Sequence, residues 1–175
     1  VRAAAQRAAL ARRPGRERIE LRRGQALDPA VLHPLRDVAA HVEQLQDALG
    51  RSVLLENLSS YVAFTDSEMS EGEFLSELVK HTGCGILFDV NNLYVNSRNL
   101  GADAQAFIHA LPRDAVAEYH LAGHSLIDGC LVDTHSTRVC DEVWDLYEYA
   151  LQHIGARPTL IEWDADIPAL AVLRE

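Results

Sequence analysis

Apolar residues recur at three- and four-residue intervals in four parts of the chain, the spacing of an amphipathic helix. This spacing predicts four helices, over residues 35–49, 70–82, 103–111 and 139–154. Ser70 and Glu73 have the separation of a capping box at the start of the second helix, and Asp103 can cap the third. A short closing helix is expected over residues 167–173, with Pro168 near its first turn.

Short apolar runs separate these helices and predict strands. The runs are SVLLEN (52–57), GILFDVNN (85–92), VAEYHLAGH (116–124), LVDTH (131–135) and TLIEWD (159–164). They are continuously apolar rather than alternating, which is typical of strands covered on both faces. Strand and helix alternate at intervals of about 30 residues, so we expect βαβ units and an α/β fold with a parallel sheet of about five strands.

Composition bounds the class of protein. A chain of 175 residues with 48% hydrophobic and 24% charged residues fits one globular domain, and no apolar run is long enough for a membrane span. Three cysteines without a C-x-x-C pair favour a reducing compartment, and we expect a cytoplasmic protein.

Charge is distributed unevenly along the chain. Residues 1–25 contain eight arginines and two glutamates, a net charge of +6. Because the whole chain has a net charge of −10, residues 26–175 have a net charge of −16. The chain therefore divides into a basic arm over residues 1–33, disordered or helical, and a domain over residues 34–175. The acidic domain disfavours nucleic acid as a partner and suits a cation.

A potential metal ligand stands at or near the carboxyl end of each predicted strand. These residues are Glu56, Asp89, His120, Asp133 with His135, and Glu162. In parallel α/β folds the carboxyl ends of the strands form one edge, where ligands and catalytic groups gather. Carboxylates crowded there would repel one another unless they were protonated, neutralised by basic residues or bound to a metal.

Taken singly, each residue has a simpler explanation: a strand-end carboxylate commonly caps the next helix, and a histidine commonly lies in a core or on a surface. The set as a whole favours a metal. Carboxylate and imidazole ligands without thiolate suit iron, manganese or zinc.

The segments LLENLSSY, LFDVNNLYVNSRN, EYHLAGH, VDTH and LIEWDADIP resemble the multinuclear non-haem iron-dependent oxidases, from about residue 34 to the carboxyl end. More distantly they resemble TIM barrels of the xylose isomerase-like group. The resemblance implies part of a (β/α)8 barrel and the metal ligands Glu56, Asp89, Asn92, His120, Asp133, His135 and Glu162. It also implies that neighbouring residues orient these ligands or the substrate, namely Asn57, Asn91, His124 and Asp164.

The resemblance further implies an iron-dependent oxidoreductase that modifies cysteine in a ribosomally made precursor peptide, with two or three iron ions. It implies a small partner protein that recruits the peptide. A complete barrel takes about 250 residues, and the first strands, expected to supply further histidine ligands, have no counterpart here. The expected protein is therefore incomplete at the amino end or completed by another chain, with fewer iron ions if those ligands are absent.

Two alternatives stay open beside the oxidase. One is a zinc- or manganese-dependent hydrolase or isomerase of the xylose isomerase-like group, and the other is a non-catalytic remnant of the barrel. An open sheet would also expose an apolar edge, which predicts association into a homo-oligomer.

Overall fold

The computed structural model describes residues 34–64, 67 and 69–174. The predicted basic arm over residues 1–33 lies outside this part of the chain. Among the described residues, none of the helices combines the length and the apolar character that a membrane span requires.

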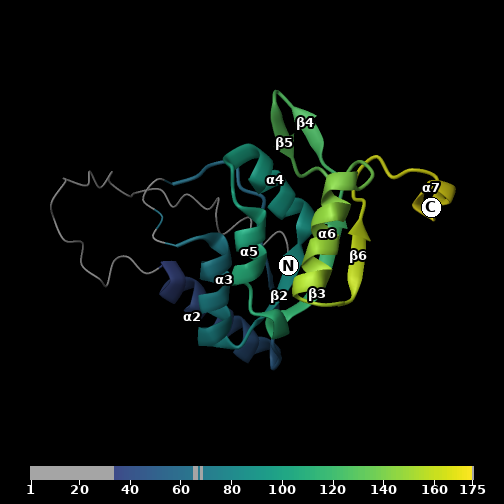
Figure 1. The fold of residues 1–175 in the computed structure, drawn as a ribbon. Helices are drawn as coiled ribbons and strands as arrows, with labels where there is room; N and C mark the ends of the chain where they lie inside the picture. The colour runs from purple at the N-terminus through teal and green to yellow at the C-terminus, as the bar shows by residue number, and fades with distance from the viewer. Residues whose placement is uncertain (1–33, 65–66, 68, 175) are drawn as a thin grey trace, which may run out of the picture. The chain divides into compact units, whose positions relative to one another are not determined.

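The centre of the domain is a four-stranded parallel sheet in the order β1-β2-β3-β6 (Figure 1). Its strands are β1 (Leu54–Glu56), β2 (Gly85–Asp89), β3 (Val116–Ala122) and β6 (Thr159–Glu162). In the register, Asp89 of β2 pairs with His120 of β3, and Ala122 of β3 pairs with Glu162 of β6. The predicted α/β fold with parallel strands and flanking helices, as in part of a TIM barrel, is confirmed.

Helices connect these strands. They are α2 (Pro34–Leu49), α3 (Glu71–Thr82), α4 (Val90–Leu100), α5 (Ala104–Ala110), the 3-10 turn η1 (Arg113–Ala115), α6 (Asp141–His153) and α7 (Leu170–Leu173). The capping box predicted for α3 is present, because Ser70 Oγ accepts from the Glu73 backbone N–H and the Glu73 carboxylate accepts from the Ser70 backbone N–H. Asp103 caps α5 as predicted, accepting from the backbone N–H of Ala106.

The main core lies on one face of β2 and β3. Phe88 and Tyr119 are fully buried there, with ring centroids 5.7 Å apart, and side chains of α3, α4, α5 and α6 pack over them. The expectation that both faces of the strands are covered is wrong for the edge strand β6, where Leu160 is 47% exposed and Ile161 is 53% exposed.

The segment LVDTH is not a fifth strand of the parallel sheet. It begins with β5 (Cys130–Val132), which pairs antiparallel with β4 (Ser125–Ile127) in a separate hairpin (Figure 1). Asp128 and Gly129 join the two strands with φ angles of 51° and 81°. Positive φ at both central residues is what a tight two-residue hairpin turn requires, so the Asp-Gly pair explains why this segment leaves the barrel pattern.

Two helices also differ from the expectation. The strand ends at Asp89 as predicted, but no helix was expected directly after it. Helix α4 begins at Val90, because the Asp89 carboxylate accepts from the backbone N–H of Asn92 and caps it. The closing helix is limited to α7 (Leu170–Leu173), since Pro168 lies before it rather than in its first turn.

Candidate metal centre

Three strands of the sheet end on a carboxylate at the same edge. Glu56 is the last residue of β1, Asp89 of β2 and Glu162 of β6. On β3 the residue at this level is His120, which pairs in register with Asp89. Because parallel strands bring their carboxyl ends together, these four residues, which are far apart in the sequence, lie at the same edge of the sheet. This edge is called the mouth of the sheet below.

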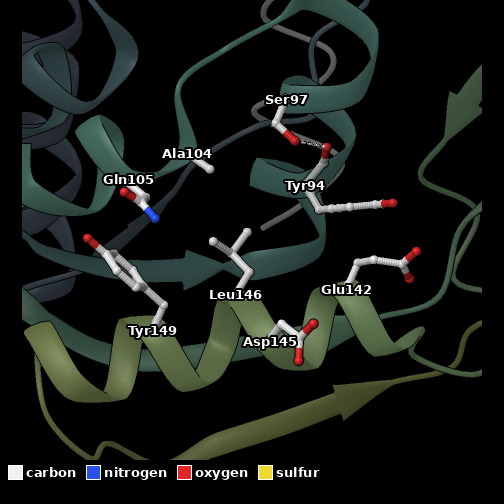
Figure 2. A pocket seen from close by; sticks show the side chains of 8 residues that line it. All are labelled: Tyr94, Ser97, Ala104, Gln105, Glu142, Asp145, Leu146 and Tyr149. Atoms are coloured by element: carbon white, nitrogen blue, oxygen red, sulfur yellow. Dashed lines mark hydrogen bonds between the residues drawn. The ribbon is translucent and has the colours of Figure 1, made fainter.

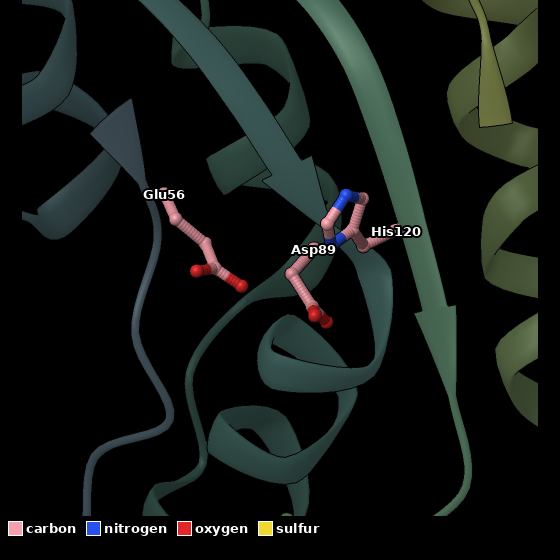
Figure 3. Close-up of side chains that lie close together, drawn as sticks. All are labelled: Glu56, Asp89 and His120. Carbon is pink, nitrogen blue, oxygen red and sulfur yellow. The ribbon is translucent and has the colours of Figure 1, made fainter. Parts of the chain in front are cut away.

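Two groups of side chains at this mouth are close enough to hold a metal ion. The first consists of Glu56, Asp89 and His120, shown in Figure 3, and the second of Asp89, His135 and Glu162. Within each group, one ligand atom from every residue lies within 4.8 Å of the others. Asp89 belongs to both groups, so the two candidate sites share one carboxylate.

The carboxylate of Asp89 has no exposure to solvent, and its position is fixed by hydrogen bonds. The side chain of Asn57 donates to the Asp89 carbonyl and accepts from its backbone N–H, both at 2.8 Å, as a neighbouring strand would. Burial raises the pKa of Asp89 well above its usual value; the hydrogen bond from the Asn92 backbone opposes this rise, and the charges of Asp133 and Glu56 add to it. A nearby cation would remove the cost of keeping this carboxylate ionised.

His135 lies in the loop after the hairpin and is held by its backbone. Its N–H donates to the carbonyl of Gly123 at 3.0 Å, and its carbonyl accepts from the N–H of Asp164 at 2.8 Å. The ring is 2% exposed and lies between carboxylates: Nε2 is 2.5 Å from Asp133 Oδ1, and Nδ1 is 3.0 Å from Glu162 Oε2 and 3.3 Å from Asp164 Oδ2. An imidazole among three carboxylates is well placed to share a cation with them.

A chain of polar contacts continues from Asp133 along the side of the mouth. Asn91 Nδ2 donates to Asp133 Oδ1 at 2.9 Å, and Asn91 Oδ1 is 2.8 Å from His124 Nδ1. Burial lowers the pKa of His124, although the charge of Asp133 opposes this effect. A neutral His124 ring that donates from Nδ1 fits this chain, which fixes the orientation of the Asp133 carboxylate.

Asp89 Oδ2 and Asn92 Oδ1 are buried at the mouth and make no hydrogen bond with the described residues. Buried oxygens without partners are costly, and a cation would satisfy both. Asn92 is held in place because its Nδ2 donates to the Asn57 carbonyl at 3.0 Å. Oxygen and imidazole donors without thiolate fit a divalent ion such as iron, manganese or zinc; the three free cysteines belong to neither group.

The structure thus brings together the residues that the sequence singled out, and they fall into two sets. Five of them form the two ligand groups: Glu56, Asp89, His120, His135 and Glu162. The other six are in neither group but contact a group member directly or through one or two neighbours: Asn57, Asn91, Asn92, His124, Asp133 and Asp164.

One neighbouring carboxylate was missed by the sequence analysis. Glu118 Oε1 lies 3.6 Å from His120 Nε2. Its signal was available in the period of a strand: residues two apart point to the same face, so Glu118 shares the face of His120.

A separate pocket of about 320 Å³ lies between α4, α5 and α6 (Figure 2). Its lining residues are Tyr94, Ser97, Ala104, Gln105, Glu142, Asp145, Leu146 and Tyr149. It includes no member of the two ligand groups.

The fold and the mouth define an α/β chain of TIM-barrel type with candidate metal-binding residues at the carboxyl end of its parallel sheet. The family described as RiPP precursor modification enzyme MbnB/TglH/ChrH matches residues 29–175. The chain belongs to this family, which lies in the xylose isomerase-like TIM-barrel superfamily.

Several curated relatives carry the family name UPF0276. A UPF0276 protein of Chromobacterium violaceum is 64% identical over 140 residues, which cover 80% of this chain and 51% of that protein. UPF0276 proteins of Caulobacter sp. strain K31 and Paraburkholderia phytofirmans are 46% and 48% identical, covering 83% and 80% of this chain and 54% and 47% of those proteins. The chain spans about half the length of the curated relatives it matches.

Proposed function

We propose that this chain carries the metal centre of an iron-dependent oxidase that modifies cysteine in a ribosomally made precursor peptide. The observation that carries the proposal is that the two ligand groups share Asp89 at the mouth of the sheet. The family description, an enzyme that modifies RiPP precursors, supports a peptide as the substrate.

The chain's own residues would divide the work at this centre. Glu56, Asp89 and His120 would hold one ion, and Asp89, His135 and Glu162 would hold the other. Asn92 Oδ1 would complete the coordination beside Asp89, since it is buried and makes no hydrogen bond with the described residues. Bound iron would supply the redox chemistry that couples oxidation of the peptide thiol to reduction of molecular oxygen.

The polar residues around these ligands would keep them in place. Asn57 fixes the backbone of Asp89, and Asp133 lies against the ring of His135 on the side opposite Glu162. Asn91 and His124 orient Asp133 in turn. Because these contacts are formed by the protein itself, the ligands are arranged before a metal binds.

The shared carboxylate gives the proposal a sharp test. The 175-residue chain is loaded anaerobically with ferrous ion, and the bound iron is counted. We expect two ions in the wild type, one in Glu56→Gln, one in Glu162→Gln and none in Asp89→Asn. Glu148→Gln on the exposed face of α6 is the matched control and should bind like the wild type. Unchanged iron content in Asp89→Asn would contradict the proposal.

The oxidase part is tested separately by incubating the iron-loaded chain with a cysteine-containing peptide in air. We expect a mass change of the peptide that requires both iron and oxygen and disappears in Asp89→Asn. Preferential binding of zinc or manganese, with no oxygen-dependent change of the peptide, would favour the hydrolase or isomerase alternative.

A further inference from the structure

We propose that Glu118 is a positioning residue for His120: it holds the proton of the ring on Nε2 and thereby leaves Nδ1 as the atom that faces the ligand group. This inference rests on the proposed metal centre and adds a residue to it. It assigns a role to a carboxylate that lies two residues before His120 on β3.

The position of Glu118 follows from the strand. Glu118 and His120 are two residues apart on β3, so their side chains leave the same face of the sheet. On the neighbouring strand β2 the residue that pairs with Glu118 is Leu87, and the residue that pairs with His120 is Asp89. Leu87 offers the Glu118 carboxylate no polar side chain, whereas His120 Nε2 lies 3.6 Å from its Oε1.

The ring of His120 lies between two carboxylates. Nε2 faces Glu118, while Nδ1 is 3.3 Å from Glu162 Oε1. Nδ1 is buried and makes no hydrogen bond with the described residues. Figure 3 shows the two ring nitrogens pointing to opposite sides, one toward Asp89 and the other away from it. Nδ1 is therefore the nitrogen that can join Glu56 and Asp89 around an ion.

A neutral imidazole carries one proton, and the carboxylate that accepts it decides which nitrogen keeps a lone pair for a metal. If the proton were on Nδ1, it would face Glu162 and block the ligand atom. Glu118 favours the productive arrangement, because a proton on Nε2 can be donated to its carboxylate. At 36% exposure the Glu118 side chain has room to approach by the few tenths of an ångström that separate 3.6 Å from hydrogen-bond distance.

The test compares two replacements of Glu118 that differ in hydrogen bonding. Glu118→Gln keeps an oxygen that can accept from Nε2–H, and Glu118→Leu removes the acceptor at similar size. Glu148→Leu on the exposed face of α6 is the control. The position of the ring proton is read from the ¹⁵N resonances of His120 in the metal-free chain, assigned with a His120→Gln variant, at a pH high enough that the ring titration is complete in each variant.

We expect the proton on Nε2 in the wild type, the control and Glu118→Gln, and a shift toward Nδ1 in Glu118→Leu. In anaerobic titrations with ferrous ion, Glu118→Leu should bind about 10- to 100-fold more weakly than the wild type, the usual cost of losing a partner of a metal-bound histidine. Glu118→Gln should lose less, and the control should lose nothing. A purely structural role would not move the ring proton.

An unchanged ring proton in Glu118→Leu would overturn the inference, whatever its iron affinity. A shifted proton with wild-type affinity would overturn it as well, since the position of the proton would then have no effect on the centre. If the wild type itself binds no ferrous ion, the metal centre proposed above fails, and the ring proton alone decides the role of Glu118.

Discussion

Replacing Asp89 by asparagine should have opposite effects on the metal-free and the metal-loaded protein. In the metal-free chain the Asp89 carboxylate is fully buried, its Oδ2 makes no hydrogen bond with the described residues, and the charges of Asp133 and Glu56 lie nearby. Asparagine removes the charge but keeps the oxygen that caps α4, because Asn is as good a helix cap as Asp. We therefore expect the metal-free variant to be more stable than the wild type.

The size of the effect follows from the groups involved. A buried polar atom without a partner costs about 1–3 kcal/mol, and the amide Nδ2 of asparagine could donate to the neighbouring carboxylates instead. The gain for the metal-free variant at pH 8 is thus about 1–3 kcal/mol. For the wild type, ferrous ion at 100 times its dissociation constant should add about 2.7 kcal/mol of stability for each ion bound, and the variant should gain almost none of it.

Urea denaturation with a chelator, and anaerobically with ferrous ion, measures both effects. The sign of the pH dependence is fixed because the pKa of Asp89 is higher in the folded than in the unfolded chain. Below the unfolded value, about 4, both states are protonated and wild type and variant should differ little. As the pH rises, the unfolded chain loses its proton first, so the wild type should lose stability relative to the variant.

Asp103→Asn is the matched control, since Asp103 caps α5 in the same way but is exposed and far from the carboxylates in sequence. It should change the free energy of unfolding by less than about 0.5 kcal/mol, with or without iron. A metal-free Asp89→Asn that is less stable than the wild type at pH 8 would refute the reasoning about the buried charge. A full stabilisation by iron in that variant would refute the role of Asp89 as a shared ligand.

Three further substitutions distinguish effects on metal binding from effects on the stability of the fold. Gly123→Ala places a methyl group against the carbonyl of Thr137, so urea denaturation should show a loss of about 1–3 kcal/mol, with weaker ferrous binding because Gly123 anchors His135. Ser70→Ala removes the cap of α3 and should cost about 1 kcal/mol, with iron binding unchanged in the same titration. Tyr119→Phe removes the hydrogen bond from the Tyr119 hydroxyl to the Gly155 carbonyl and should cost about 1 kcal/mol of stability. Burial raises the pKa of Tyr119 from 10.0 to about 12 in the folded chain, so the unfolded chain loses this proton first as the pH rises. The wild type should therefore lose stability relative to Tyr119→Phe between pH 10 and 12.

The sequence predicted the parallel sheet and most of the strand-end residues because both depend on local pattern. Apolar runs of strand length, each ending on a carboxylate or histidine, place those side chains at one edge whatever the distance between them in the chain. Helices α2, α3, α5 and α6 follow from the spacing of their apolar residues and from caps such as Ser70 and Asp103.

The differences arise where one residue has two roles. Asp89 ends a strand and also caps a helix, and the asparagine-rich segment after it has low intrinsic helix propensity, so α4 could not be recognised from its own residues. The hairpin was missed because LVDTH was considered alone, without the Asp128-Gly129 turn before it. The edge exposure of β6 depends on what lies beside the strand, which a pattern along the strand does not contain.

Helix α4, which the sequence did not predict, explains why the ligands are ordered. Its asparagines bind two separate segments: Asn96 holds the loop after β1 through the carbonyl of Leu58 and the N–H of Ser60, and Asn99 holds both backbone groups of Leu131 in the hairpin. The loop follows Glu56, and the hairpin precedes Asp133, which contacts His135, so one helix fixes the chain beside both ligand groups. The residues that make α4 a poor helix in isolation are thus the ones that connect it to its neighbours, and the cap provided by Asp89 joins this scaffold to the carboxylate that both ligand groups share.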